Sequence, residues 1–274
     1  MKVFYHNDLD GRCAGAIAYR YYGKTPQITL IEIDYKDEID VDAITKDEKI
    51  VIVDFSFKPE AMERVLEKTK NVIWIDHHKT AFEYKYSKEL DGERDVEFSG
   101  CELAWKYWYP EKPMPRAVEL IGDRDKWAWK YGKETADFNM GMKTYDHQPK
   151  DMLLWENLFN ENRHVLNDVK ERGRICLLFR DMFCKDYADS YGFETEYGGY
   201  KCFAMGLYMF GSEAFGDRMD KHDICLSFVF DGKKWTVGLY SKTIDVSEIA
   251  KKNGGGGHRG AAGFVCDSLP FKKQ

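Results

Sequence analysis

The sequence predicts an α/β protein of two domains: an N-terminal parallel sheet covered by helices, and a smaller C-terminal α/β domain with a mixed sheet. Over the first 80 residues, short β-rich runs alternate with helical patterns, which is typical of a parallel sheet with crossover helices. A second β-rich region begins after Tyr191, beyond a long helical stretch. At 274 residues the chain also exceeds the usual size of one domain, about 100 to 150 residues, which favours two.

The N-terminal domain is expected to span residues 1–142. Its strands are predicted at residues 2–6, 27–35, 49–55 and 71–76. Helices are predicted at residues 11–22, 59–69, 101–108 and 116–122. Pro59 suits the first turn of the second helix, and the last two segments carry apolar residues at three- to four-residue spacing.

A helical linker over residues 143–190 is expected to join this domain to a C-terminal domain at residues 191–274. Apolar residues form a helical stripe between residues 151 and 187. The C-terminal domain contains the β-rich runs YKCFAMGLY, ICLSFVF and KWTVGLYS, and Asp231-Gly232 predicts a hairpin turn between the last two. A short helix, VSEIAKK, and the run NGGGGHRGAAGF follow.

Composition and charge narrow the class of protein. The net charge of -6 disfavours a groove for long duplex nucleic acid, which requires dense Lys and Arg, and favours a small anionic substrate.

No apolar run is long enough for a membrane span and no signal peptide precedes the charged N-terminus, so we expect a cytoplasmic protein without membrane association. Seven scattered cysteines without a CxxC pair indicate reduced thiols. The sequence does not define the oligomeric state.

Acidic and imidazole side chains follow three of the four predicted N-terminal strands, in HNDLDG, VDFS and IDHH. Ligands bind beyond the carboxyl ends of the strands in an open parallel sheet, so these side chains are expected to converge. Taken singly, each aspartate could be a helix N-cap. The convergent set consists of His6, Asp8, Asp10, Asp54, Asp76 and His77.

Such a set predicts two divalent metal ions. Oxygen and imidazole ligands without a thiolate favour Mn(II), with Mg(II) as the alternative, over structural zinc. Several carboxylates placed together could not all ionise without cations. Two ions would activate water and neutralise charge on a phosphoryl group, which predicts hydrolysis at phosphorus.

The adjacent pair His77-His78 suggests a division of roles. Adjacent side chains of an extended segment point to opposite sides, so we expect His77 to be a metal ligand and His78 to contact the substrate or leaving group. By the same periodicity, residues two apart on a strand share a side, which would place His6 beside Asp8.

These motifs resemble the DHH phosphoesterase superfamily, named for the triplet that stands here as Asp76-His77-His78. The segments HNDLDG, VIVDFS and ELIGDRDKW are similar to its other N-terminal motifs, and GGGGHRGAAGF to the signature of its DHH-associated C-terminal domain. The resemblance implies that the triplet is catalytic. It implies one metal held by His6, Asp8 and Asp54, and a second held by Asp10, Asp54, His77 and Asp123.

The first motif differs from that of some superfamily members, and the last motif contains two candidate ligands. In some branches of the superfamily the histidine lies four residues before the first aspartate, whereas His6 precedes Asp8 by two. The last motif contains both Asp123 and Asp125; Asp123 is chosen because it directly follows the apolar run LIG, and Asp125 would then orient ligands.

The glycine run of the C-terminal domain is a candidate substrate-binding site. Successive glycines let the backbone approach a ligand and present N–H groups to an anion, although a flexible linker has the same composition. The resemblance implies that this domain binds the non-scissile end of the substrate, in a cleft between the domains and near Ser241. The expected contacts are Gly255, Gly256, Gly257, His258 and Arg259.

The predicted function is therefore a Mn-dependent two-metal hydrolase of phosphodiester or phosphoanhydride bonds, acting on small anionic substrates and foremost on short oligonucleotides. Hydrolysis of cyclic dinucleotides, nucleoside bisphosphates or polyphosphate is the alternative within this class. A non-catalytic nucleotide-binding scaffold is the alternative outside it. The aromatic clusters WKYWYP and WAWKY are expected to pack in the core rather than to stack on bases.

Overall fold

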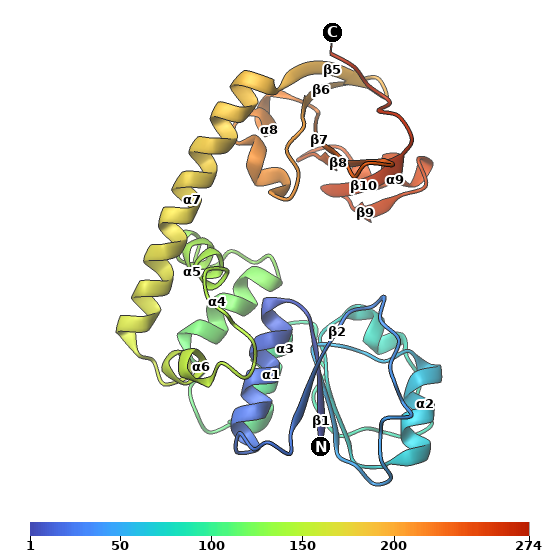
Figure 1. Ribbon diagram of the computed structural model, residues 1–274, viewed down its shortest axis with the longest axis vertical. Coiled ribbons are helices and arrows are strands. Elements are labelled where there is room, and N and C mark those ends of the chain that lie inside the picture. The colour runs from blue at the N-terminus through green and yellow to red at the C-terminus, as the bar shows by residue number, and fades with distance from the viewer. Residues whose placement is uncertain (274) are drawn as a thin grey trace. The chain divides into compact units, whose positions relative to one another are not determined.

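The computed structural model describes residues 1–273 and contains two compact units, with the boundary between Cys176 and Leu177. Helix α7 (Arg163–Tyr191) contributes to both units. Each unit holds its own sheet, parallel in the first and mixed in the second (Figure 1). The predicted α/β fold with two different sheets is thereby confirmed.

The first unit is built on a four-stranded sheet in the order β2-β1-β3-β4. Every neighbouring pair is parallel, so all four strands end at the same edge. The strands are β1 (Lys2–His6), β2 (Thr29–Ile33), β3 (Ile50–Val53) and β4 (Val72–Ile75). This common edge is where the motifs HNDLDG, VDFS and IDHH begin.

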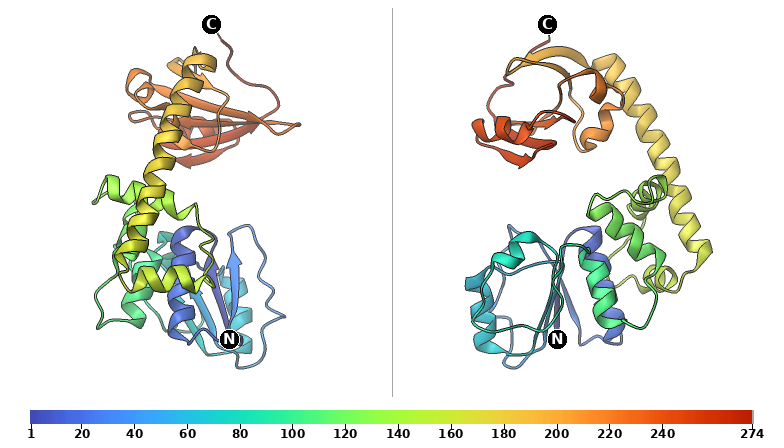
Figure 2. Two further views of the ribbon diagram at one scale, coloured as in Figure 1. Left: turned by 60° about the vertical axis from the view of Figure 1, so that its left-hand side comes forward. Right: turned by 180° about the vertical axis from the view of Figure 1, so that it is seen from behind.

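Helices cover both faces of this sheet. Side chains alternate along a strand, so Val51 and Val53 pack with α1 (Leu9–Tyr21) and α3 (Gly100–Trp108), whereas Ile50 and Ile52 pack with α2 (Pro59–Lys68). Figures 1 and 2 show α1 and α3 on one face and α2 on the other. Because both faces are buried, the central strands are apolar throughout, as parallel strands usually are.

Further helices of the first unit pack on the α1 side: α4 (Arg116–Asp125), α5 (Lys133–Met142), α6 (Met152–Phe159) and the first half of α7. The short helix η1 (Lys79–Glu83) packs instead on the α2 side, through Ala81. The helical stretch predicted at residues 151–187 is interrupted between α6 and α7, where Glu161 has a positive φ of 59°. Helix α5 was not predicted. Trp105 and Trp108 are buried as expected, whereas Trp127 is exposed.

The second unit is a six-stranded sheet in the order β5-β6-β7-β8-β10-β9. Only β6 and β7 are parallel among these pairs. One face packs against α9 (Val246–Lys252) and the other against α8 (Arg218–Lys221), η2 (Gly211–Phe215) and the end of α7. The strands are β5 (Phe193–Tyr197), β6 (Tyr200–Met205), β7 (Ile224–Phe230), β8 (Trp235–Tyr240), β9 (Gly256–His258) and β10 (Ala261–Cys266).

The predicted hairpin turn lies between β7 and β8. Gly232 has a φ of 96°, and Asp231 Oδ1 accepts hydrogen bonds from the Lys233 and Lys234 N–H groups at 2.7 Å. In the part of the chain that the structure describes, no helix combines the length and the apolarity needed to cross a bilayer.

Candidate metal centre

The first candidate ligands lie in the turn between β1 and α1. Asp8 is the N-cap of α1, and its Oδ1 accepts a hydrogen bond from the Gly11 N–H at 2.8 Å. Its Oδ2 lies 2.8 Å from His6 Nδ1. Burial alone would raise the pKa of Asp8, but the hydrogen bonds from His6 and Gly11 outweigh it and lower the pKa. Gly11 is required because a Cβ there would lie 2.3 Å from the His6 carbonyl oxygen.

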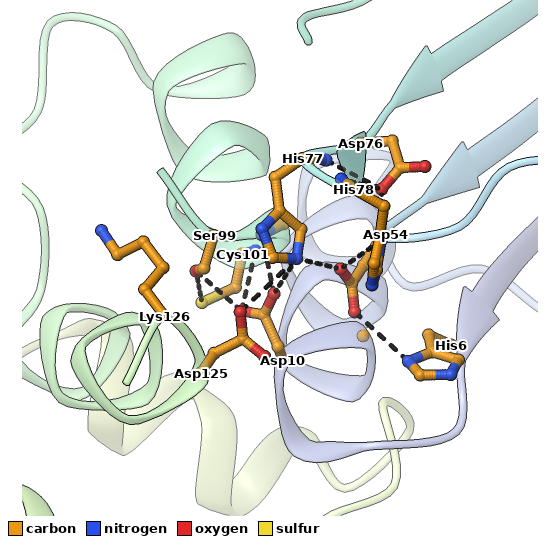
Figure 3. A network of polar contacts seen from close by, with 12 residues as sticks. His6, Asp10, Asp54, Asp76, His77, His78, Ser99, Cys101, Asp125 and Lys126 are labelled. Carbon is orange, nitrogen blue, oxygen red and sulfur yellow. Dashed lines mark hydrogen bonds and ion pairs between the residues drawn. The ribbon is translucent and has the colours of Figure 1, made fainter. Parts of the chain in front are cut away.

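Asp10, in the first turn of α1, points its buried carboxylate at the N-terminus of α3 (Figure 3). It accepts hydrogen bonds from Ser99 Oγ at 2.8 Å, the Gly100 N–H at 2.7 Å and the Cys101 N–H at 3.1 Å. The first N–H groups of a helix lack partners within the helix and carry partial positive charge, so they favour a carboxylate. Ser99 lies 89 residues from Asp10 in the sequence, so no local motif marks this support.

Asp54 directly follows β3 and is held in an uncommon backbone conformation. Its φ is 55°, a left-handed value that Asp tolerates better than most residues, and its N–H donates to the Ile75 carbonyl at 2.8 Å. The residue is 1% exposed, and neither carboxylate oxygen has a hydrogen-bond partner. Burial, followed by the charges of Asp10 and Asp8, raises the pKa of Asp54 well above its ordinary value. A buried carboxylate without partners is costly, so this position favours a bound cation.

The Asp76 carboxylate forms hydrogen bonds with the other two residues of the triplet. Oδ1 accepts the N–H groups of His77 at 2.8 Å and His78 at 3.2 Å, and it lies 2.8 Å from His78 Nδ1. Oδ2 accepts a hydrogen bond from Ser56 Oγ. Asp76 is fully buried, and its hydrogen bonds make it a positioning residue for the two histidines.

The two imidazole rings of the triplet lie side by side, with centroids 4.5 Å apart. The expectation that His77 and His78 point to opposite sides is therefore wrong, because β4 ends at Ile75 and Asp76 bends the chain around its own carboxylate. Burial lowers the pKa of His77, whereas the hydrogen bond to Asp76 outweighs burial and raises the pKa of His78.

His77 points into the centre of the cluster (Figure 3). Its Nε2 lies 3.2 Å from Asp54 Oδ1, 3.4 Å from Asp125 Oδ2 and 3.9 Å from Asp10 Oδ2, yet it has no hydrogen-bond partner. A buried nitrogen that faces three carboxylates in this way is well placed to be a metal ligand.

Of the two aspartates at the end of α4, the structure places Asp125 in the cluster and Asp123 outside it. Asp125 faces His77, and burial together with the charges of Asp10 and Asp8 raises the pKa of Asp125 to about 8. Residues two apart on a helix point in different directions, so Asp123 is turned away. Its buried carboxylate accepts hydrogen bonds from the N–H groups of Lys130 at 2.7 Å and Tyr131 at 3.2 Å, and from Thr135 Oγ1.

Three overlapping groups of side chains could each hold a metal ion, with the ligand atoms of each group within 4.8 Å of one another. They are His6, Asp8 and Asp54; Asp10, His77 and Asp125; and Asp54, His77 and His78. Carboxylate oxygen and imidazole nitrogen are ligands that Mn²⁺ accepts, and Mg²⁺ accepts the oxygens. The unpartnered buried atoms of Asp54 and His77 lie where the groups overlap, so the residues fit divalent cations.

The residues of the glycine run all lie in the second unit. Gly256, Gly257 and His258 form β9, and the side chains of His258 and Arg259 are exposed. Gly257 has a φ of 141°, and a Cβ there would lie 2.5 Å from Ala262 Cα. Ser241 is close by, since its N–H donates to the Gly260 carbonyl at 3.1 Å, but its hydroxyl donates to the Asp223 carbonyl at 2.6 Å.

The N-terminal part of the chain is similar to a known protein family. Residues 1–123 match the profile of the DHH family, N-terminal domain. This segment runs from β1 into α4 and contains the proposed ligands of the first unit except Asp125.

Two relatives align with most of the chain. Uncharacterized protein R106 of Acanthamoeba polyphaga mimivirus is 26% identical over 260 residues, which cover 83% of this chain and 56% of that protein. The chain thus spans just over half the length of the mimivirus protein. Oligoribonuclease NrnB of Bacillus subtilis is 24% identical over 294 residues, which cover 95% of this chain and 71% of that protein.

A solved structure supports the fold. The pGpG-specific phosphodiesterase PggH of Vibrio cholerae superposes with a TM-score of 0.63 at 14% identity, covering 97% of this chain and 93% of that one. The likeness concerns the fold alone at this identity. Residues 1–123, which match the N-terminal domain of the DHH family, thus contain the triplet Asp76-His77-His78 within a cluster of side chains that could hold metal ions.

Proposed function

We propose that the protein is a phosphoesterase that uses two divalent metal ions to hydrolyse phosphodiester bonds in short oligonucleotides. The observation that carries the proposal is the overlap of three ligand groups at Asp54 and His77, whose buried donor atoms have no hydrogen-bond partner. Metal-assisted hydrolysis requires such a preformed site with ligands held by their own supports. Here the support comes from the α3 N-terminus and from Asp76.

Asp54 is the proposed bridge between the two metal sites. The first site would consist of His6, Asp8 and Asp54, and the second of Asp10, Asp54, His77 and Asp125. Asp125 takes the place for which the sequence suggested Asp123, because only Asp125 faces His77. The mixed oxygen and imidazole donors favour Mn(II), with Mg(II) as the alternative. Two ions bound there would lower the pKa of a bound water and neutralise charge on the phosphoryl group.

His78 is the proposed substrate contact of the first unit. Asp76 holds its Nδ1 at 2.8 Å and so fixes the orientation of the ring. Although burial opposes it, the hydrogen bond to Asp76 raises the pKa of His78 and so favours the protonated ring, in which the opposite nitrogen, Nε2, can donate a hydrogen bond to a phosphoryl or leaving-group oxygen. This places a directional donor beside the carboxylates, which themselves only accept hydrogen bonds.

The choice of short oligonucleotides rests on charge and on relatives. The net charge of -6 disfavours long duplexes. The B. subtilis relative is named an oligoribonuclease, and the V. cholerae structure is named for pGpG, a linear dinucleotide. We further propose that the exposed His258 and Arg259, with the N–H groups of Gly255, Gly256 and Gly257, bind the non-scissile end of the substrate.

The test compares Asp54→Asn with Asp47→Asn. Both aspartates have a left-handed backbone, with φ of 55° and 59°, and asparagine tolerates this conformation, but Asp47 is exposed on the surface. Each purified variant would be incubated with Mn(II) and a dinucleotide, a short RNA, a cyclic dinucleotide, a nucleoside 3′,5′-bisphosphate or polyphosphate, and the products separated by ion exchange.

We expect Mn-dependent turnover, fastest on the linear oligonucleotides, to fall about 100-fold or more in Asp54→Asn and to persist in Asp47→Asn. Preference for another compound would move the protein to that substrate class. If the protein binds Mn(II) but turns over none of these compounds, the proposed catalytic activity is contradicted and a nucleotide-binding scaffold is favoured.

A further inference from the structure

An exposed tyrosine lies against the proposed metal centre. Tyr35 is in the turn that follows β2, next to the central strand β1. Its ring centroid lies 5.4 Å from that of His6 and 5.9 Å from that of His78. The residue is nevertheless 45% exposed. No sequence motif marks Tyr35, and the metal ligands do not account for an aromatic side chain at this place.

The ring is held in position from one side. It packs on Phe55 with a centroid separation of 4.7 Å and an interplanar angle of 32°. Phe55 is buried and directly follows Asp54 in the chain. The residue that supports the Tyr35 ring is therefore adjacent in sequence to the proposed bridging ligand. The rings of His6 and His78 approach the Tyr35 ring at steeper interplanar angles, 57° and 82°, and 45% of the residue remains exposed to a ligand.

The turn that carries Tyr35 is also fixed. The Tyr35 N–H donates to Asp34 Oδ1 at 2.7 Å, and the Asp34 N–H donates to Asp37 Oδ2 at 2.8 Å. The Asp37 N–H donates in turn to the Asp34 carbonyl at 2.9 Å. An aromatic ring that is already ordered loses little conformational entropy when a second ring stacks on it.

We propose that Tyr35 is the platform on which one nucleobase of the substrate stacks while the phosphate attached to the same sugar lies at the metal centre. The inference rests on the proposed phosphoesterase function and narrows its substrate class to phosphodiesters that carry a base. Stacking on an aromatic ring tolerates every base, because each base has a π-face. The subsite therefore selects nucleotides over inorganic polyphosphate without selecting a sequence.

The contacts of Tyr35 with two imidazole rings support this assignment. His6 belongs to the proposed ligands and His78 is the proposed substrate contact, so the Tyr35 ring lies beside both the proposed metal site and the proposed phosphate contact. A role restricted to covering Phe55 would give the same packing. The two roles differ in whether the effect of removing the ring depends on a base in the substrate.

The experiment uses the full chain with Tyr35→Ala, Tyr35→Phe and the control Tyr21→Ala. Tyr21 is an equally exposed tyrosine, at 50%, that packs against Tyr22 with a centroid separation of 5.0 Å. It lies at the end of α1 opposite to Asp10. The substrates are a dinucleotide and two analogues, one lacking the 5′ base and one lacking the 3′ base. The values measured are kcat/KM with Mn(II) and Mn(II) affinity by calorimetry.

We expect Tyr35→Ala to lower kcat/KM for the complete dinucleotide about 5- to 100-fold, with Tyr35→Phe and Tyr21→Ala close to wild type. On one of the two abasic analogues the loss should disappear, because the stacking partner is already missing. Mn(II) affinity should not change.

Other outcomes overturn the inference in distinguishable ways. Equal losses on all three substrates, or a weakened Mn(II) affinity in Tyr35→Ala, would show that the ring only supports the centre. Wild-type activity in Tyr35→Ala would remove the subsite and leave the phosphoesterase standing. No Mn-dependent cleavage by the wild type would overturn both proposals.

Discussion

At the scale of single residues, Asp123 and Asp125 differ in what their carboxylates meet. Asp125 faces His77, and burial followed by the charges of Asp10 and Asp8 raises its pKa, whereas Asp123 accepts three hydrogen bonds from the segment that follows α4. Removing Asp125 should weaken Mn(II) binding about 10- to 100-fold or more, and relieve charge repulsion in the metal-free protein. Calorimetric titration of Asp125→Ala with Mn(II) measures this effect.

Asp123→Ala is the matched variant. It leaves two partly buried N–H groups and the buried Thr135 hydroxyl without an acceptor, so the free energy of unfolding should fall by about 1 to 3 kcal/mol. Mn(II) affinity of the folded protein should be retained. The reverse pattern, with weak Mn(II) binding in Asp123→Ala and normal binding in Asp125→Ala, would return the ligand role to Asp123.

The sequence predicts only those site residues whose position follows from a strand end. His6, Asp54 and His77 are placed together because parallel strands end at one edge. The choice between Asp123 and Asp125 depends on the path of the chain after α4, where Trp127 and Trp129 adopt positive φ values that no pattern predicts. Tyr35 could not be identified either, since its role depends on ring contacts with residues far along the chain.

At the scale of elements, the centre depends on the close approach of α3 to the end of β3. Gly100, the first residue of α3, donates its N–H to Asp10 at 2.7 Å, and a Cβ there would lie 2.4 Å from Asp54 Cβ. Gly100→Ala should therefore displace α3 or Asp54, although alanine itself favours helices. We expect weaker Mn(II) binding and a lower melting temperature.

Gly15→Ala provides the comparison for this prediction. Gly15 is also helical, in α1, but the nearest atoms to an added Cβ belong to the side chains of Pro149 and Tyr5 at 3.1 Å, which can shift. Its Mn(II) affinity should stay near that of the wild type. If Gly100→Ala binds Mn(II) as tightly as Gly15→Ala does, the close approach of α3 is not required for the centre.

Elements with a strong apolar pattern were predicted, and those without one were not. The four parallel strands and α1 to α4 lie within a few residues of their expected places. Helix α5 was missed because its buried side is partly polar, with Thr135 and Asn139 beside Phe138 and Met142. Strand β9 was missed because two of its three residues are glycine, and it exists only through pairing with β10.

At the scale of the whole molecule, the proposed metal centre and the proposed anchoring residues belong to different compact units. All residues of the three ligand groups precede Cys176, and the glycine run follows Leu177. Metal binding and substrate anchoring should therefore respond separately to mutation. The resemblance to the superfamily predicted that metal binding and substrate anchoring lie in different domains. Composition and periodicity alone do not predict this separation.

Arg259→Ala tests the division. The Arg259 side chain is exposed, and its backbone carbonyl accepts the Val246 N–H at 2.9 Å, so the substitution leaves the backbone contact intact. If Arg259 binds the non-scissile phosphate, KM for a dinucleotide should rise about 10-fold, since hydrogen bonds to charged groups contribute about 1.5 to 3 kcal/mol. The number of bound Mn(II) ions and their affinity should equal those of the wild type.

The control variant is Lys233→Ala, which also removes one positive charge. Lys233 is exposed and lies in the turn between β7 and β8 of the same unit. A KM that rises equally in both variants would indicate nonspecific attraction, and an unchanged KM in Arg259→Ala would remove this arginine from the substrate site.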